Sequence, residues 1–458
     1  MSAVLEDVIE HTRLVPLSQV VEVNPKIDRT ALHDNLDVSF VPMAAVEALS
    51  GGIDVSTIRT YAEVKKGYTH FRDGDILFAK VTPCMENGKM AIARKLVNGV
   101  GFGSTEFHVL RPRAGVDARF IYYFVSSQTF RKEASGHMTG AVGLRRVPSA
   151  YVEEQLIPLP GIEQQREIVA ELEKQFSRLD EAVANLRRVK ANLKRYKASV
   201  LKDAVEGRLV PTEAELARRE GRSFETGEQL LQRILETRRS TWNGKGKFNE
   251  PVPPSTAALP HLPDGWTWAT MPQLGELNRG KSKHRPRDDA ALYGGLYPFI
   301  QTGDVRRSDG SITEHSQTYS EFGLKQSRLW PIGTLCITIA ANIAETGILK
   351  LEACFPDSVV GFVSEQGYPT TEYVAFFIRT ARDGLDRVAS ATAQKNINLE
   401  VLEAVAVPTP PLVEQQRIVA EVDRRLSLIR GVEAEVDANL KRAQALRQAT
   451  LRKAFAPS

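Results

Sequence analysis

The chain repeats itself, and this internal repeat restricts its fold more than any other feature of the sequence. The segment PLPGIEQQREIVAELE at 158–173 recurs as PTPPLVEQQRIVAEVD at 408–423, with Gln164 matching Gln415. Weaker matches at similar offsets extend the repeat over the rest of the chain. A repeat of this length is a whole structural unit, so we expect two similar halves, each a globular unit followed by a helix.

Each half ends in a long segment with the heptad spacing of a helix that packs against another helix. Prolines precede both segments, as expected at a helix start. About 42 residues at ~1.5 Å each would form a rod of roughly 60 Å. A pseudo-two-fold repeat would pair the two helices in antiparallel orientation. The predicted helix seam and subunit interface consists of Val169, Leu172, Phe176, Leu179, Leu186, Leu193, Val419, Val422, Leu426, Ile429, Val436 and Leu440.

Polar residues interrupt this seam at Lys190, Lys197 and Glu433. These interruptions suggest that helices from a partner cover part of the pair. The alternative is that the two segments are simple coiled-coil spacers.

The globular units alternate short apolar runs with turn residues, which favours curled, mostly antiparallel β-structure. FRDGDILFAKV at 71–81 resembles LWPIGTLCITI at 329–339, with Leu77 matching Leu335. A short helical patch and a polar loop follow in each unit. Between the halves, 227–242 resembles an amphipathic helix, and 243–265 is a Pro/Gly linker.

These patterns predict an α+β protein in which two β-rich globular domains are separated by two long antiparallel coiled-coil helices. The predicted segments are a first globular domain (1–157), a first long helix (158–206), a connector (207–262), a second globular domain (263–407) and a second long helix (408–458).

Composition excludes several classes of protein. The net charge of +4 does not by itself indicate a nucleic-acid binder, so any such surface must be local. The three cysteines form no CxxC pair, which fits a reducing cytoplasm. The first residues contain no signal-peptide core, and the longest apolar stretch, 334–344, is too short to span a bilayer. We therefore expect a cytoplasmic protein without a membrane segment.

The motifs identify a family. The chain resembles the specificity subunits of Type I restriction-modification systems over nearly its full length. The resemblance rests on the two EQQ segments, on the ALHDNL and ALYGGLYPFIQTGDV runs, and on LPDGWTW at 262–268. The first unit departs from the pattern because HTRLVPLSQV lacks the Gly-Trp opening.

This resemblance implies a function without catalysis. Each globular unit would be a target-recognition domain for one half of a bipartite sequence in double-stranded DNA. The helices would set the spacer and bind two methyltransferase subunits, which restriction-translocase subunits then join. S-adenosylmethionine, ATP and Mg would belong to those partners, and this chain would bind no cofactor.

Arg, Lys, Asn and Gln side chains read base edges, whereas phosphate contacts only position a protein on the duplex. A basic or polar side chain in a loop could instead be part of an ordinary solvated surface. In the first unit the candidates for DNA contact are Lys80, Thr82, Lys89, Arg94, Thr139, Arg145 and Arg146. In the second unit they are Arg279, Lys281, Lys283, Arg285, Arg287, Gln394, Lys395 and Asn396.

Two other functions compete with this one. GELNRGKS at 275–282 matches the phosphate-binding pattern GxxxxGK[ST] of nucleotide-hydrolysing enzymes, but Pro286 prevents the helix that should follow. The scattered histidines form no metal-ligand pair, and no amino-methyltransferase tetrapeptide is present. The remaining alternative is a coiled-coil adaptor without a role at DNA.

Overall fold

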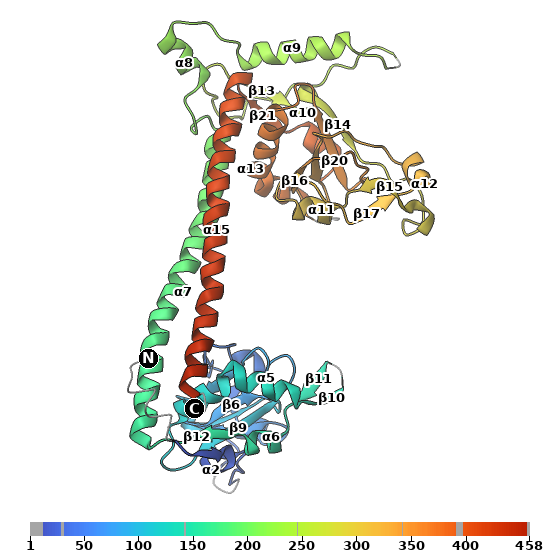
Figure 1. Cartoon of the computed structure of the whole chain (residues 1–458). Helices are drawn as coiled ribbons and strands as arrows, with labels where there is room; N and C mark the ends of the chain where they lie inside the picture. Colours follow the sequence, from blue (N-terminus) through green and yellow to red (C-terminus); the bar gives the residue numbers. More distant parts are fainter. Residues whose placement is uncertain are drawn as a thin grey trace. The chain divides into compact units, whose positions relative to one another are not determined.

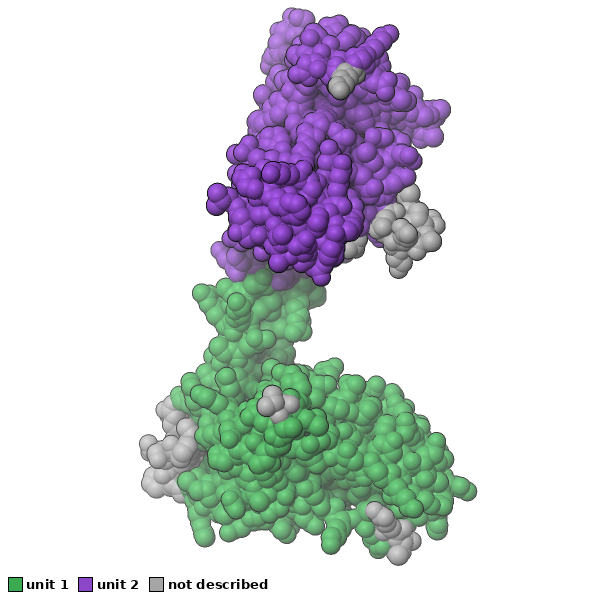
Figure 2. All heavy atoms as spheres, turned by 90° about the vertical axis from the view of Figure 1, so that its right-hand side faces the viewer, with its two compact units in different colours: residues 1–188, 436–458 green, residues 189–435 purple. Residues whose placement is uncertain are grey.

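The computed structural model describes residues 12–28, 32–141, 143–244, 246–340, 342–390 and 397–455. The chain divides into two compact units, shown in green and purple in Figure 2. Unit 1 comprises residues 1–188 and 436–458, and unit 2 comprises residues 189–435. Each unit therefore takes in part of both long helices, whereas the five sequence segments separate the helices from the globular domains.

The two long helices are α7 (Ile162–Val205) and α15 (Leu412–Phe455), each of 44 residues. Unit 1 holds the start of α7 and the end of α15, and unit 2 holds the reverse, so the helix segments run antiparallel within each unit (Figure 1). In unit 1, Arg447 of α15 forms an ion pair of 2.8 Å with Asp180 of α7 and lies 4.3 Å above the Phe176 ring. The predicted fold class is confirmed.

Unit 1 is built on two small sheets. The first sheet has the order β2-β9-β6-β7 and the second has the order β4-β3-β8-β5, and β3–β8 is the parallel pair among them. The strands are β1 (Leu14–Pro16), β2 (Val21–Val23), β3 (Asp37–Val41), β4 (Ile58–Thr60), β5 (Thr69–Arg72), β6 (Ile76–Ala79), β7 (Met90–Ile92), β8 (Val100–Gly103), β9 (Phe107–Pro112), β10 (Thr139–Ala141), β11 (Leu144–Arg146) and β12 (Leu156–Pro158). The helices are α2 (Leu17–Val20), α3 (Tyr61–Val64), α4 (Ala118–Ser126), α5 (Gln128–Gly136) and α6 (Ser149–Glu154), with 3-10 turns at Met43–Ala45 and Val97–Gly99.

Strand β6 lies at the centre of unit 1, which explains why all four of its residues are buried. Ile76 and Phe78 belong to the core beneath α4 and α5, whereas Leu77 and Ala79 belong to the core shared with the second sheet. Successive side chains of a strand point to opposite faces, so a strand covered on both faces reads as a continuous apolar run. ILFA is such a run.

Unit 2 has one sheet with the order β14-β20-β18-β19-β16 and a separate pair, β15–β17. The strands are β13 (Thr267–Thr270), β14 (Gly275–Arg279), β15 (Tyr293–Phe299), β16 (Ser311–Ile312), β17 (Gln317–Tyr319), β18 (Leu335–Thr338), β19 (Thr346–Leu349), β20 (Val359–Ser364) and β21 (Ala406–Thr409). The helices are α10 (Met271–Leu274), α11 (Thr302–Arg307), α12 (Glu321–Lys325), α13 (Thr370–Ser390) and α14 (Leu399–Glu403), with a 3-10 turn at Ala290–Leu292.

The repeat is visible in the structure. Each globular domain is closed at its base by an antiparallel pair made of its first and last strands, β1–β12 in unit 1 and β13–β21 in unit 2. A one-turn helix follows the first strand in both cases, and a long helix follows the last strand. The entry and exit of each domain are therefore neighbours.

One glutamine of each EQQ motif has the same structural role in both halves, which explains why the motif recurs. The side chains of Gln165 and Gln415 are almost fully buried, and their Nε2 groups donate to the carbonyls of Pro160 and Pro410, each at 2.9 Å. Each glutamine thus ties the first turn of a long helix to the proline that precedes it.

The same two side chains also hold the domain helices. Gln165 Oε1 accepts from the backbone N–H of Asp117, the cap of α4, at 2.9 Å. Gln415 Oε1 accepts from the hydroxyl of Thr370, the first residue of α13, at 2.8 Å. The sequence match of Gln164 to Gln415 is therefore wrong, because Gln164 is exposed and the structural offset is one residue shorter.

The connector between the halves contains two helices, of which only the second was predicted. They are α8 (Glu213–Glu220) and α9 (Gly227–Ser240), and both begin with a capping box, formed by Thr212 and Glu215 and by Thr226 and Gln229. Leu230, Leu231 and Ile234 of α9 pack into the main core of unit 2. The connector therefore belongs to the packed structure of unit 2.

Candidate nucleic-acid interface

Most candidate side chains lie on loops at one edge of each sheet. In unit 1, β2 and β6 are both antiparallel to β9, so their carboxyl ends meet at the same edge. In unit 2, β14 and β18 are both antiparallel to β20 and share an edge in the same way. We name this edge the loop edge. In unit 1 it carries residues 24–28, 80–89, 137–141 and 143–147, and in unit 2 it carries residues 280–289, 339–340 and 342–345.

A hairpin formed by β10 and β11 extends the loop edge of unit 1. The backbone N–H of Thr82 donates to the carbonyl of Arg145 at 3.0 Å, and that of Val147 donates to the carbonyl of Lys80 at 2.9 Å. Unit 2 repeats the second bond, because the N–H of Ile397 donates to the carbonyl of Ile339 at 3.1 Å.

This shared bond makes Lys80 and Ile339 counterparts. Consequently Ile76, and not Leu77, corresponds to Leu335 of β18. The predicted match was one residue out of register, which in a strand exchanges the two faces.

Buried polar side chains hold the hairpin in place. His108 lies on β9 with only 5% of its surface exposed. Asn24 Nδ2 donates to His108 Nδ1 at 3.0 Å, and His108 Nε2 donates to the Val147 carbonyl at 2.8 Å. Burial lowers the pKa of His108, so the neutral ring that this bridge requires is favoured. Neither residue could be singled out from the sequence as a support for the hairpin, because a lone polar side chain carries no local signal.

Carboxylates neutralise most of the hairpin's positive charge. Arg146 forms two hydrogen bonds with Glu106, at 2.7 and 2.8 Å, and this bonding lowers the pKa of Glu106. Arg145 lies 4.0 Å from Glu86. Lys80 stands beside Glu106 and Arg146, and burial lowers its pKa. DNA would therefore have to compete with these carboxylates of the same chain for the cations.

The other candidates in unit 1 are dispersed. Thr139 is exposed on the hairpin, and the Thr82 hydroxyl lies 3.7 Å from the sulfur of Met138. Lys89 is at the loop edge, where its ammonium donates to the Met43 carbonyl at 3.1 Å. Arg94 follows the carboxyl end of β7 and is therefore at the opposite edge of the sheet. The structure brings together Lys80, Thr82, Thr139, Arg145 and Arg146 but not Arg94.

The basic run of unit 2 is more open. Arg279, Lys281, Lys283, Arg285 and Arg287 are all exposed, and Arg287 pairs with Asp357 at 2.9 and 3.0 Å. Within the described residues, the other four have no carboxylate within salt-bridge distance. Gln394, Lys395 and Asn396 lie outside the described residues.

Backbone contacts fix the course of this basic run. The Gln326 side chain accepts from the N–H groups of Lys283 and His284, at 2.5 and 3.0 Å. The Ser327 hydroxyl donates to the carbonyl of Lys281 at 2.8 Å. Held in this way, the run presents its cations to solvent from a defined backbone.

The nucleotide-binding alternative does not fit this segment. Residues 275–279 form strand β14 instead of a loop that leads into a helix. Gly280 passes so close to the carbonyls of Phe355 and Pro356 that a Cβ at this position would collide with them. The glycine is therefore needed for packing against these two carbonyls.

The predicted seam residues differ in burial. Val169, Leu172, Phe176, Val419, Val422, Leu426, Ile429 and Val436 are buried, whereas Leu179, Leu186, Leu193 and Leu440 are only partly buried. In unit 1, Phe176 packs against Tyr123 of α4, and Phe455 of α15 packs against Phe120. The domain as well as the other helix therefore buries the seam.

Two features are absent from the described residues. No group of His, Cys, Asp and Glu side chains there is arranged to hold a metal ion. No helix in the same residues combines the length and apolar content that a bilayer crossing needs.

Comparison with known proteins identifies the family. The profile described as Type I restriction modification DNA specificity domain matches residues 11–193 and 263–437. The chain belongs to this family. The two matched regions correspond to the two halves of the repeat, each covering one globular domain and much of the helix that follows it.

Two specificity subunits from Escherichia coli are similar to this chain in sequence. The specificity subunit of the Type I restriction enzyme EcoAI is 32% identical over 300 residues, which cover 56% of this chain and 49% of that protein. The EcoEI specificity subunit is 25% identical over 470 residues, covering 89% of this chain and 76% of that protein. The chain thus spans about half the length of the first relative.

Two solved structures share the fold. A chain from a study of complex assembly and conformational transition in the type I R-M system has a TM-score of 0.69 at 20% identity, and the match covers 97% of this chain and 98% of that chain. The HsdS subunit from Thermoanaerobacter tengcongensis has a TM-score of 0.55 at 20% identity, with 97% of both chains covered.

Proposed function

We propose that this chain is the non-catalytic specificity subunit of a Type I restriction-modification complex. Each unit would recognise one half of a bipartite sequence in double-stranded DNA, and the chain would direct methyltransferase and restriction-translocase subunits to that sequence. S-adenosylmethionine, ATP and Mg would be bound by those partners. The observation that carries this proposal is one framework present twice, with different side chains on the same loop edge.

A shared framework with divergent loops is what a two-part reader requires. Buried residues such as Gln165 and Gln415 make equivalent contacts in both units, so the backbone scaffold is fixed. Equivalent loops of the loop edges carry different side chains, because residues 24–28 of unit 1 contain one lysine, whereas residues 280–289 of unit 2 carry the basic run. Different side chains on base edges select different sequences.

The long helices support the proposed partners. In unit 2, Val189 and Tyr196 of α7 and Leu428 and Val432 of α15 are 40 to 60% exposed. Apolar side chains spaced by four and seven residues on a helix form a stripe that another helix can cover. We assign this stripe to the methyltransferase subunits.

A domain exchange tests the proposal directly. Residues 1–157 would be replaced by the corresponding domain of a relative, and DNA from cells that carry the chimera with its partner subunits would be mapped for methylation. We expect a new sequence in one half-site and the original sequence in the other. A change in both halves, or no methylation that depends on this chain, would contradict the proposal.

Lengthening the helices tests the ruler role. Seven residues inserted into each of α7 and α15 would preserve the heptad phase and add ~10 Å to each helix. We expect the unspecified spacer to lengthen by about three base pairs, at 3.4 Å of duplex per pair. An unchanged spacer in active enzyme would count against this role.

A further inference from the structure

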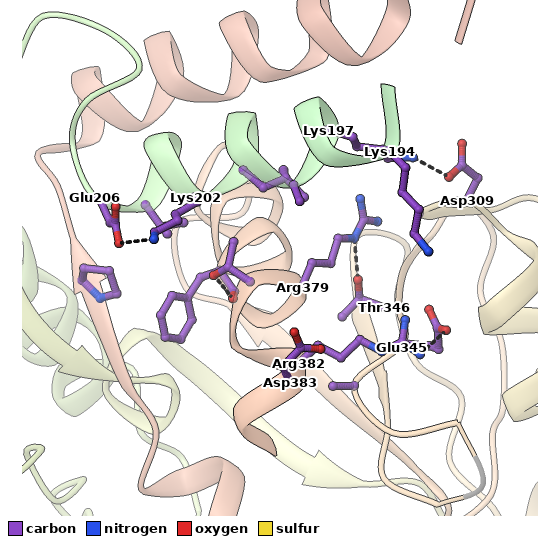
Figure 3. A pocket seen from close by; sticks show the side chains of 18 of the residues that line it. Lys194, Lys197, Lys202, Glu206, Asp309, Glu345, Thr346, Arg379, Arg382 and Asp383 are labelled. Atoms are coloured by element: carbon purple, nitrogen blue, oxygen red, sulfur yellow. Dashed lines mark hydrogen bonds and ion pairs between the residues drawn. The ribbon is translucent and has the colours of Figure 1, made fainter. Parts of the chain in front are cut away.

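A pocket of about 840 Å³ in unit 2 has a lining with more positive than negative charge. Helix α7 forms one wall and helix α13 another, and α11 with residues 344–346 completes it (Figure 3). The cationic side chains in the lining are Lys194, Lys197, Lys202, Arg306, Arg379 and Arg382. The acidic ones are Glu206, Asp309, Glu345 and Asp383.

Three of these cations already have carboxylate partners. Lys197 pairs with Asp309 at 3.5 Å, and Arg382 pairs with Glu345 at 2.9 Å. Lys202 lies 4.0 Å from Glu206, the residue that directly follows α7. These pairs leave little net charge, so an anion in the pocket would interact mainly with the remaining cations.

The other three cations, Lys194, Arg306 and Arg379, have no carboxylate within salt-bridge distance among the described residues. Arg306 donates to the Asn342 side chain at 3.3 Å, and Arg379 Nε donates to the Thr346 hydroxyl at 2.8 Å. The guanidinium of Arg379 lies against Gly310, where the Cβ of any other residue would collide with it.

Arg379 is costly to keep charged in this place. Burial lowers its pKa and so disfavours the cation, and the carboxylates of Asp309, Glu345 and Asp423 only partly oppose this effect. A negatively charged ligand would offset that cost, because a cation held at low dielectric interacts strongly with an anion.

The position of the pocket indicates which anion. Residues 344 and 345 belong to the loop edge of unit 2, and Arg306 bonds to Asn342 of the same loop. A duplex read at this edge would bring its backbone beside the pocket. Resting on the proposed function, we propose that Lys194, Arg306 and Arg379 hold a phosphodiester of the bound DNA backbone.

The repeat places a counterpart pocket in unit 1. A pocket of about 730 Å³ lies between α5 and the end of α15, and its lining includes Gln448 and Arg452. At the structural offset of 250 residues these correspond to Ala198 and Lys202 of the unit 2 pocket. The position of Lys194 is held by Gln444 there. The unit 1 pocket has fewer cations, so unit 2 should make the stronger backbone contact.

The test uses the full chain assembled with its methyltransferase subunits and a 40-base-pair duplex. Affinity would be measured between 50 and 200 mM salt for wild type, Lys194→Gln and Lys194→Gln with Arg306→Gln. The control is Lys174→Gln, an exposed lysine on the same helix that pairs with Glu171 outside the pocket. Tryptophan fluorescence during urea unfolding would show that unit 2, which contains all four tryptophans, remains folded.

One lost phosphate contact lowers the slope of log affinity against log salt by about 0.9. We expect part of this change for Lys194→Gln, with roughly three-fold weaker binding to every duplex and an unchanged methylated sequence, because a phosphate contact carries no sequence information. The double variant should approach the full loss of about 0.9, because the three cations share one phosphodiester. The control should bind as wild type does.

Three other results have distinct meanings. Unchanged slopes in both variants, with wild-type binding that depends on salt, would overturn the phosphate site and leave the proposed function intact. A change of methylated sequence in Lys194→Gln would also overturn it, since the residue would then act in base reading. ATP could stabilise unit 2 of the wild type but not of Lys194→Gln, while the salt slopes for DNA stay unchanged. That result would assign the pocket to a free nucleotide and overturn the proposal that it holds the DNA backbone. If wild type shows no preferred sequence, the proposed function itself fails.

Discussion

The hairpin arginines at the loop edge of unit 1 face carboxylates, whereas most cations of the basic run in unit 2 do not. Arg146 is bound by Glu106 and Arg145 lies near Glu86, but Arg279 and Lys281 have no carboxylate partner among the described residues. The framework beneath them is nevertheless the same, down to the buried glutamines that start both long helices. Framework and surface have therefore diverged independently, and the surfaces should respond differently to the same substitution.

The largest effect should come from the shared framework. Gln165→Ala and Gln415→Ala each leave buried hydrogen-bonding groups without a partner, which should cost about 2 kcal/mol of the free energy of unfolding. Because all four tryptophans lie in unit 2, Gln415→Ala should shift the fluorescence transition in urea, whereas Gln165→Ala should shift part of the circular dichroism transition and leave the fluorescence transition unchanged.

The neighbouring Gln416 provides the control for this prediction. Its side chain is exposed, so Gln416→Ala should change stability by less than about 0.5 kcal/mol. Equal effects of Gln415→Ala and Gln416→Ala would refute the structural equivalence of Gln165 and Gln415.

The next effect concerns the charges at the loop edge. Lys281→Gln combined with Lys283→Gln removes two exposed cations, so DNA affinity should fall roughly ten-fold and the salt slope by about 1.8. Arg146→Gln should lower the salt slope by less than the value of about 0.9 for one phosphate contact, because Glu106 already neutralises that guanidinium. A larger slope change for Arg146→Gln than for the double variant would reverse the comparison.

The smallest effect should be a difference in acid sensitivity. Burial lowers the pKa of His70 to about 4 and also lowers that of His108, from an ordinary value of 6.5. The unfolded state of unit 1 then binds more protons below that value, so the stability present above pH 6.5 is lost as the pH falls toward 4. Burial raises the pKa of Glu414 in unit 2, so this carboxyl adds stability as the pH falls.

Unit 1 should therefore lose about 1 kcal/mol between pH 7.5 and 5.5 relative to unit 2. Urea unfolding would be followed at both pH values by fluorescence, which reports unit 2, and by circular dichroism, which reports both units. The part of the circular dichroism transition that does not coincide with the fluorescence transition measures unit 1. Replacing both histidines, with His70→Gln and His108→Asn, should flatten the response of unit 1. An unaltered pH response in that variant would rule out these two groups as its source.

Much of the fold could be predicted from the sequence, because repeats and heptads are patterns along the chain. The helix seam follows from Leu172 and its periodic neighbours, the antiparallel pairing follows from the repeat, and the strands follow from runs such as ILFA. The register of the repeat could not be predicted. EQQR has the same letters in both copies, but an additional residue, Glu167, separates it from the following IVAE, and only helix phase shows that Gln165 is the buried glutamine.

The candidate site was less accessible to sequence reasoning. Basic residues can be seen in a sequence, but whether a carboxylate such as Glu106 binds them depends on strands far apart in the chain. Asn342 and Arg306 were missed because each is a single polar residue, the first in a short loop and the second near the end of the short helix α11. Alignment of Lys80 with Ile339 in the repeat would have drawn attention to that loop.

The pairing of the first and last strands in each globular domain has an evolutionary consequence. Because β1 lies beside β12 and β13 beside β21, a whole domain can be exchanged through two cuts that meet at one place on the scaffold. The EQQ segments, nearly identical in the two halves, are natural points for genetic recombination at such a junction. A lineage could thereby acquire new target preferences by shuffling domains, without re-evolving the hydrogen bonds that anchor them.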